Sequence, residues 1–248
     1  MHTKGQLLRV SCGIKHYMQC VILAAGNGTR LRPLTENTPK PLVKVAGKAL
    51  LDHILEALPS AVDEIIMVTG YLEEQLREHF GSEYNGRKIT YVHQAEQKGT
   101  GHALWLCKDL IKGRFVFMFA DDIHGTADLA RLTSYTRGML ALTTQTPERF
   151  GIVVRHPDGT LAQFVEKPVH APSNLASTGV FVLDEHIFEF EPTTETNGEF
   201  YHTDMIREYA KIYPIAVVEQ NLWIPVGYPE DIQTAEAILR TAANTNSG

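Results

Sequence analysis

The stretch VILAAGNGTRLRPLTENTPKPL, residues 21–42, is the most informative part of the sequence. A short apolar run leads into Gly26 and Gly28, then into Arg30 and a Lys-Pro phrase around Lys40. Such an apolar run predicts a buried strand, and glycines let backbone N–H groups approach a bulky anion. Arginine can grip two phosphate oxygens at once. The stretch therefore predicts a strand followed by an anion-binding loop.

Strands and helices alternate from residue 19 to about residue 146. The expected strands are 19–25, 64–69, 88–92, 114–120 and 139–145, and the expected helices are 48–58, 72–80, 101–111 and 126–137. This order predicts an α/β fold with a mixed, mainly parallel sheet and helices on both faces.

The pattern changes after residue 146. A hairpin is expected around the turn PDG, with strands at 150–155 and 160–167. The remaining expected elements are strands at 175–183, 215–220 and 222–224 and helices at 200–212 and 229–242. We expect one domain, 18–243, with lobes at about 18–146 and 147–243, an N-terminal extension at 1–17 and a frayed tail at 244–248.

Composition excludes several classes of protein. The chain has 248 residues, of which 44% are hydrophobic and 21% charged, as in a globular protein. The net charge of −6, without a dense Lys/Arg block, predicts no nucleic-acid partner. No apolar run approaches the roughly 18 residues of a membrane span. Three cysteines without a CxxC pair predict neither disulfide nor structural zinc, and a cytoplasmic location.

The sequence of the opening loop does not match two common phosphate-binding motifs. A dinucleotide-binding fingerprint needs a third glycine, and the loop has an arginine where that motif continues. The P-loop pattern GxxxxGK[ST] is absent.

The phrases GNGTRLRPLT and PKPL resemble the signature of the sugar-phosphate nucleotidyltransferases, or NDP-sugar pyrophosphorylases. The likeness extends through most of residues 19–239. It implies a Rossmann-like nucleotide-diphospho-sugar transferase fold, with Arg30 and Lys40 as catalytic residues on the nucleotide phosphates. It also implies a set of nucleotide-binding residues: Ala25, Gly26, Gly28, Thr29, Gln94, Gly99 and Thr100.

The segment HQAEQKGTGHA, residues 93–103, resembles the base-reading loop of the pyrimidine-using members, especially the uridylyltransferases for N-acetylglucosamine-1-phosphate. The amide of Gln94 offers a donor and an acceptor, which suits the O4/N3 edge of uracil or thymine. Taken alone, Gln94 is equally a satisfied loop amide. We interpret His102 as a residue at the start of a helix and not as a catalyst.

The phrases RFGIVV, FVEKP and ASTGVFV resemble the sugar side of the same family. The resemblance implies a sugar-phosphate site made of Gly151, Glu166, Lys167, Thr178, Gly179 and Trp223. Trp223 is either a platform for the sugar or a core residue.

FMFADDI ends a strand with two carboxylates, and Asp121 aligns with the family's metal-binding aspartate. Mg²⁺, which prefers oxygen ligands, is the implied cofactor. The pair also suits a helix N-cap or a solvated turn. The chain departs from the family at WIPVG, where Pro225 replaces a second metal-binding aspartate. Either Asp121, Asp122 and substrate phosphates hold the metal, or the site is weakened.

The implied reaction is nucleotidyl transfer from a nucleoside triphosphate, UTP or dTTP, to a sugar-1-phosphate, with release of pyrophosphate. One alternative is a guanylyltransferase for mannose-1-phosphate or a cytidylyltransferase for a small phosphorylated alcohol. Another, which Pro225 favours, is a nucleotide-binding regulatory pseudoenzyme. The expected partners are the two substrates, with no membrane, and a homo-oligomer is left open.

Overall fold

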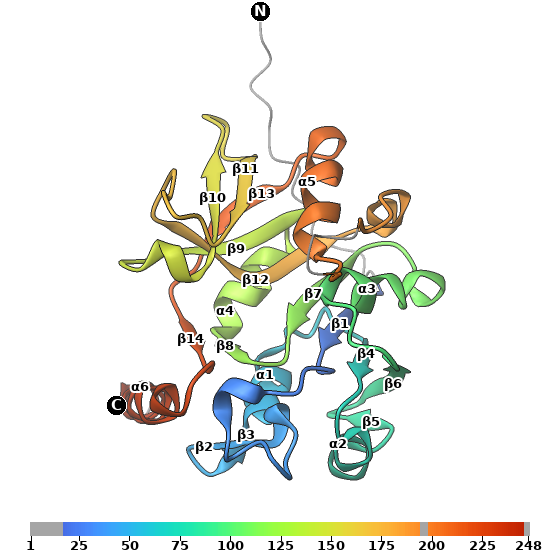
Figure 1. Ribbon diagram of the computed structural model, residues 1–248, viewed down its shortest axis with the longest axis vertical. Helices are drawn as coiled ribbons and strands as arrows, with labels where there is room; N and C mark the ends of the chain where they lie inside the picture. The colour runs from blue at the N-terminus through green and yellow to red at the C-terminus, as the bar shows by residue number, and fades with distance from the viewer. Residues whose placement is uncertain (1–16, 194–197, 246–248) are drawn as a thin grey trace, which may run out of the picture.

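The computed structural model describes residues 17–193 and 198–245, and a ten-stranded mixed sheet forms the centre of this part of the chain (Figure 1). Four strands run parallel in the order β6 (Arg87–His93), β4 (Glu64–Thr69), β1 (Gln19–Leu23) and β7 (Phe115–Phe119). Strands β4 and β6 lie on one side of β1 in the sheet, and the chain then crosses over so that β7 lies on the other side of β1. Because the strand order reverses at β1, a crevice opens at the carboxyl ends of β1 and β7, where such sheets bind ligands.

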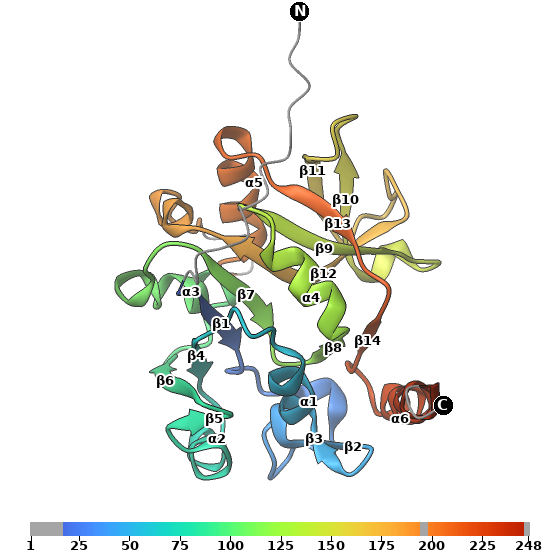
Figure 2. The same cartoon turned by 180° about the vertical axis from the view of Figure 1, so that it is seen from behind.

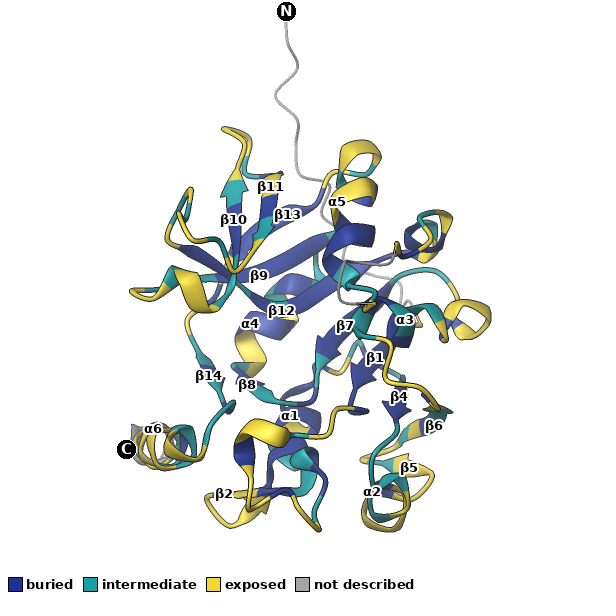
Figure 3. Cartoon of the chain, in the orientation of Figure 1, coloured by how far each residue is buried: buried dark blue, intermediate teal, exposed yellow. Residues whose placement is uncertain are grey.

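Strand β1 is the buried strand that the apolar run predicts. All five of its residues are buried, and the central strands are dark blue in Figure 3. Cys20 and Ile22 contribute to the hydrophobic core on one face of the sheet, and Val21 and Leu23 to the core on the other. This alternation is the period of two that a strand imposes on its side chains.

Helices cover both faces of the sheet, as predicted. The first core contains residues of α1 (Leu50–Ala57), α2 (Glu73–Phe80), α4 (Thr126–Thr133) and α6 (Pro229–Thr245). The second contains residues of α3 (Thr100–Trp105) and α5 (His202–Ile212). Figure 1 shows α3 and α5 in front of the sheet, and Figure 2, from behind, shows α4 and α1. The predicted α/β architecture is therefore confirmed.

The second half of the sheet is mostly antiparallel. Strand β12 (Leu175–Leu183) pairs with β7, and β10 (Gly151–Arg155) pairs with β12 and with β11 (Leu161–Glu166). The β10–β11 pair confirms the predicted hairpin. β9 (Gly138–Thr143) also pairs with β12, and β13 (Ala216–Glu219) lies parallel to β9.

Short elements could not be predicted from the sequence, because they contain too few residues to show the hydrophobic periodicity of a strand or a helix. The missed strands are β2 (Lys44–Val45), β3 (Lys48–Ala49), β5 (Glu83–Tyr84) and β8 (Asp122–His124). There are also 3₁₀ turns: η1 (Thr29–Leu31), η2 (Lys40–Leu42), η3 (Lys108–Leu110), η4 (Pro147–Arg149) and η5 (Glu185–Glu189). Of these, β8 matters most for function, since it pairs antiparallel with β14 (Trp223–Pro225).

Helix α4 ends at Thr133, four residues before the predicted end. The guanidinium of Arg114 donates to the carbonyl oxygens of Thr133 (2.9 Å) and Thr136 (3.1 Å) and also to that of Tyr135. It satisfies carbonyls that a helix end leaves without partners. A distant side chain thus fixes this boundary, and the local sequence carries no sign of it.

At the carboxyl end, α6 continues to Thr245, past the predicted domain boundary at residue 243. Residues 1–16 of the expected extension and 246–248 of the expected tail lie outside the described residues. Cys20 and Cys107 are buried free thiols. In the described part of the chain, every helix is too short or too polar to cross a membrane.

Candidate active site

The loop after β1 is folded tightly against the segment that carries Lys40. Gly28 adopts a left-handed conformation (φ 61°), and its carbonyl accepts a hydrogen bond from the Thr35 hydroxyl at 2.7 Å. A Cβ at Gly28 would lie 3.0 Å from the Cβ of Lys40, so the glycine permits both the backbone turn and the close approach. The sequence of the opening stretch thereby brings Lys40 back toward the carboxyl end of β1.

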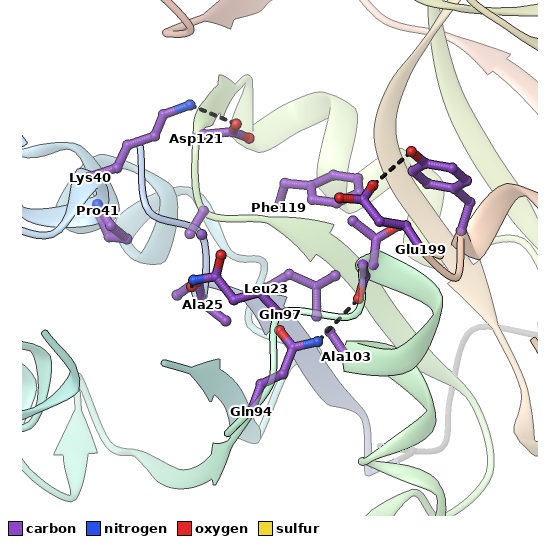
Figure 4. Close-up of a pocket in the computed structure, with 16 residues that line it drawn as sticks. Leu23, Ala25, Lys40, Pro41, Gln94, Gln97, Ala103, Phe119, Asp121 and Glu199 are labelled. Atoms are coloured by element: carbon purple, nitrogen blue, oxygen red, sulfur yellow. Dashed lines mark hydrogen bonds and ion pairs between the residues drawn. The ribbon is translucent and has the colours of Figure 1, made fainter. Parts of the chain in front are cut away.

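A first cavity of about 300 Å³ lies at the carboxyl ends of β1 and β7 (Figure 4). Seven of the predicted site residues line it: Ala25, Gly26, Lys40, Gln94, Gly99, Thr100 and Asp121. Gly28 and Thr29, at the start of η1, line neither this cavity nor the second cavity that adjoins it. The structure thus brings most of the predicted nucleotide-side residues together at the crevice.

Lys40 and Asp121 form an ion pair at the mouth of this cavity, with Nζ 2.7 Å from Oδ2 (Figure 4). The side chain of Lys40 is 11% exposed and that of Asp121 is 35% exposed. Lys40 begins η2 between Pro39 and Pro41, which restrict the chain on both sides. In this state the predicted phosphate-binding cation and the predicted metal-binding carboxylate neutralise each other.

The amide orientation of Gln94 follows from its neighbours. Its Nε2 donates to the carbonyl oxygen of Gly99 at 3.1 Å and lies 3.0 Å from Nδ1 of His102. A carbonyl can only accept, so the nitrogen of Gln94 must face Gly99. Burial and the nearby charge of Lys98 lower the pKa of His102, which favours the neutral ring that can accept. The oxygen of Gln94 is the group left for a ligand.

Backbone contacts fix the loop that carries Gln94. Gly99 has a φ of 91°, and a Cβ there would lie 2.5 Å from the carbonyl oxygen of Phe200. Lys98 O accepts from Phe200 N at 2.8 Å, and Phe200 O accepts from Gly101 N at 2.7 Å. The loop is therefore docked on the segment before α5 and can tolerate only glycine at position 99.

A second cavity, of about 630 Å³, adjoins the first. All of the predicted sugar-phosphate residues line it: Gly151, Glu166, Lys167, Thr178, Gly179 and Trp223. Arg30 lines this cavity and not the first, although the resemblance implies a role on the nucleotide phosphates. Asp121, Thr100, Phe119 and Tyr201 line both cavities, so a ligand in one lies directly beside a ligand in the other.

The β8–β14 pair shows which residue faces position 225. Pro225 lies directly opposite Asp122, and both line the second cavity. The indole Nε1 of Trp223 donates to Oδ2 of Asp122 at 2.8 Å, while its ring packs against Phe150 with centroids 4.8 Å apart. Burial and the adjacent charge of Asp121 raise the pKa of Asp122 to about 8. Trp223 thus orients the carboxyl group of Asp122. This group lies on β8, opposite β14, where the resemblance leads one to expect the second aspartate.

Several cavity residues were missed by sequence reasoning. Gln97 lies in the predicted base-reading loop and donates to the carbonyl of Ala25 at 3.0 Å. Arg149 directly precedes the Phe-Gly of the sugar-side phrase, so the motif gave a signal for it. Tyr228 also lines the second cavity, and it is a lone aromatic without any local signal.

Comparison with known proteins agrees with this arrangement. The model of the nucleotidyl transferase family matches residues 19–242. The chain is 36% identical over 239 residues to the UTP–glucose-1-phosphate uridylyltransferase AglF of Haloferax volcanii, an alignment that covers 90% of this chain and 97% of AglF. It is 35% identical over 232 residues to the bifunctional protein GlmU of Methanocaldococcus jannaschii, covering 92% of this chain and 56% of GlmU. The chain therefore spans little more than half of GlmU.

Solved structures share the fold. A putative glucose-1-phosphate thymidylyltransferase from Bacillus anthracis, in complex with a sucrose, superposes with a TM-score of 0.82 at 27% identity and covers 91% of this chain and 96% of its own. A UDP-glucose pyrophosphorylase complexed with UDP-glucose gives a TM-score of 0.80 at 26% identity and covers 92% of this chain and 100% of its own. With the match over residues 19–242, these relatives confirm the expected Rossmann-like fold, and the chain belongs to the nucleotidyl transferase family.

Proposed function

We propose that the chain transfers a nucleotidyl group from UTP or dTTP to a sugar-1-phosphate and releases pyrophosphate. The observation that carries this proposal is the pair of adjoining cavities that share Asp121 and Thr100. The first cavity is lined by the amides of Gln94 and Gln97, and the second is lined by cationic side chains. Two adjoining cavities of this kind suit two anionic substrates that must react with each other. The names of AglF and of the two solved structures point to uridylyl or thymidylyl transfer in these relatives.

The base preference rests on Gln94. Both hydrogens of its amide group face protein acceptors, at Gly99 and His102, and its oxygen remains for the ligand. An acceptor matches the N3–H of uracil or thymine and opposes the N3 lone pair of cytosine. Guanine also presents an N–H at its pairing edge, so a guanylyltransferase is the alternative that the choice of nucleotides must test.

The chemistry needs no general base, because the attacking phosphate oxygen is already ionised at neutral pH. The difficulty is the repulsion between two polyanions, since two unit charges 4 Å apart interact by about 4 kcal/mol at an effective dielectric of 20. Lys40 stands at the first cavity, and Arg30 and Lys167 stand at the second. Their role is to position the substrates and to stabilise the charge that develops on the leaving pyrophosphate.

Mg²⁺ fits two adjacent aspartates, of which Asp121 lines both cavities and Asp122 lines the second. Asp121 and Asp122 offer the oxygen ligands that this ion prefers. Among residues 17–193 and 198–245, no group of three or more His, Cys, Asp or Glu side chains is placed to hold a metal. We propose that these two aspartates hold the ion together with substrate phosphates. When bound, it would offset phosphate charge.

A pseudoenzyme is the second candidate, and the proline opposite Asp122 favours it. It would bind a nucleoside triphosphate tightly and release no pyrophosphate.

We further propose a cytoplasmic location.

A pyrophosphate-release assay tests the function. UTP, dTTP, CTP and GTP are each combined with glucose-1-phosphate, N-acetylglucosamine-1-phosphate and mannose-1-phosphate. We expect the highest kcat/KM with UTP or dTTP and much lower values with CTP. Preference for GTP or CTP would refute the proposed base specificity. Nucleotide binding without pyrophosphate in any combination would identify the pseudoenzyme.

A further inference from the structure

Two arginines of the second cavity meet at one tyrosine ring. The guanidinium carbon of Arg30 lies 5.3 Å from the centroid of the Tyr228 ring, and that of Arg149 lies 5.5 Å from the same centroid. All three residues line the second cavity. They come from η1, η4 and the turn before α6, so only the folded chain brings them together.

The ring of Tyr228 stands on a fixed turn. The carboxylate of Asp231 accepts hydrogen bonds from the backbone N–H groups of Gly227 and Tyr228, both at 2.8 Å. The carbonyl of Tyr228 in turn accepts from Asp231 N at 3.0 Å. The start of α6 therefore holds the ring in a defined position, and the ring in turn orients both guanidinium groups.

Neither guanidinium has a carboxylate partner within residues 17–193 and 198–245, although four acidic residues line the same cavity. Each of these four is engaged elsewhere. Asp121 pairs with Lys40, Asp122 accepts from Trp223, Glu166 lies 3.8 Å from Nζ of Lys167, and Asp231 accepts from the turn. The two arginines are exposed toward the cavity and remain available to a ligand.

Two like charges held at one ring repel each other, and an anion bound by both relieves that repulsion. The planar fork of arginine matches two oxygens of a phosphate. We propose that Arg30 and Arg149 form a phosphate clamp across Tyr228, in which Arg149 binds the phosphate of the sugar-1-phosphate. This assignment rests on the proposed function. Both arginines line the second cavity and neither lines the first, which favours the sugar-1-phosphate over the nucleotide as the source of the phosphate.

Steady-state kinetics of Arg149→Ala test the clamp. We expect the KM for the sugar-1-phosphate to rise about tenfold or more, as for the loss of a charge-assisted bond, while the KM for the nucleoside triphosphate changes less than about twofold. Arg149→Lys keeps the charge without the fork and should recover part of the loss. An unchanged KM for the sugar-1-phosphate, or a rise confined to the nucleotide, would overturn the assignment.

Arg155→Ala is the matched control. Arg155 is an exposed arginine of the neighbouring strand β10, pairs with Glu219 at 2.7 Å and lines neither cavity. It should leave both KM values unchanged. Tyr228→Phe keeps a ring for the two cations and Tyr228→Leu does not, so the leucine variant should lose more affinity for the sugar-1-phosphate. Equal losses in the two variants would exclude the ring from the clamp.

Calorimetric titration with inorganic phosphate separates the clamp from the reaction. It needs no turnover, so it remains informative if the wild type releases no pyrophosphate and the proposed function fails. Arg149→Ala should weaken phosphate binding about tenfold relative to wild type and to Arg155→Ala, at unchanged thermal stability. Phosphate affinity equal in all three proteins would show that Arg149 binds no phosphate.

Discussion

The two adjoining cavities differ in how they select a ligand. The first is shaped by backbone and amides: Gly99 packs on Phe200, and Gln94 presents an oxygen whose orientation its neighbours fix. The second is lined by charged side chains, among them Arg30, Arg149 and Lys167. Shape and hydrogen bonding can discriminate between bases, whereas cations bind a phosphate through its charge and discriminate less between the groups attached to it. We therefore expect the first cavity to determine which base is accepted and the second to bind a phosphate mainly through its charge.

The largest effect is expected from one cation of each cavity, Lys40 of the first and Arg30 of the second. Lys40→Ala or Arg30→Ala should reduce kcat by about 10²-fold or more, by analogy with the loss of one donor to a developing oxyanion. Initial rates at saturating substrates measure this. Lys44→Ala, an exposed lysine of β2, is the control and should retain full activity. Near-wild-type turnover in the first two variants would remove them from the machinery.

Asp121, one of four residues that line both cavities, should couple them. Asp121→Ala removes the carboxylate that both cavities contact. We expect the dependence of the rate on Mg²⁺ concentration to disappear and both KM values to rise by about tenfold. Measuring the rate as a function of Mg²⁺ concentration tests this expectation. Asp109→Ala, at an exposed position, serves as the control. Undiminished activation by Mg²⁺ would contradict the proposed role of Asp121.

Two glycine substitutions should separate the cavities. A Cβ at Gly151 would lie 2.6 Å from the Phe164 ring and 3.0 Å from a carboxylate oxygen of Glu166, so Gly151→Ala should raise the KM for the sugar-1-phosphate about tenfold. Gly99→Ala displaces the base loop and should raise the KM for the nucleotide by a similar factor. Each variant is the control for the other. If either variant raised both KM values equally, the division into two sides would be wrong.

The smallest effect concerns His202, a histidine that lines the second cavity. His202 packs against Phe117, Phe119 and Phe181, and burial lowers its pKa to about 3. Below pH 6.5 the unfolded chain takes up a proton that the folded chain refuses, so the free energy of unfolding falls as the pH falls. Between pH 6.5 and 5 this loss is about 1–2 kcal/mol.

Urea unfolding at the two pH values checks this contribution. His202→Phe should show a smaller loss of stability on acidification than wild type, and His156→Phe, at an exposed position, should behave like wild type. An identical pH dependence in the His202 variant and wild type would exclude His202 as the source.

Much of the fold could be predicted because the central strands are short apolar runs buried on both faces. Strand β4 begins and ends at the predicted residues. Helix ends could not be predicted where a distant group sets them, as Arg114 does for α4. The predicted site residues followed from contiguous motifs. The pairing of Pro225 opposite Asp122, and the contact of Arg149 with Tyr228, depend on cross-strand register and tertiary contact, which no local pattern contains.

The ion pair between Lys40 and Asp121 has a consequence for the order in which charges enter the site. Without substrate, the two groups make this part of the crevice electrically neutral. A phosphate that binds Lys40 alone would leave the carboxylate of Asp121 without a partner. A cation that binds Asp121 alone would leave the ammonium of Lys40 without a partner. Either ion by itself therefore breaks the ion pair and compensates only one of its two members. A nucleotide that arrives together with its counter-ion gives both residues a new partner at once. Binding then becomes an exchange of ions, and the protein should favour the complexed nucleotide over either ion alone.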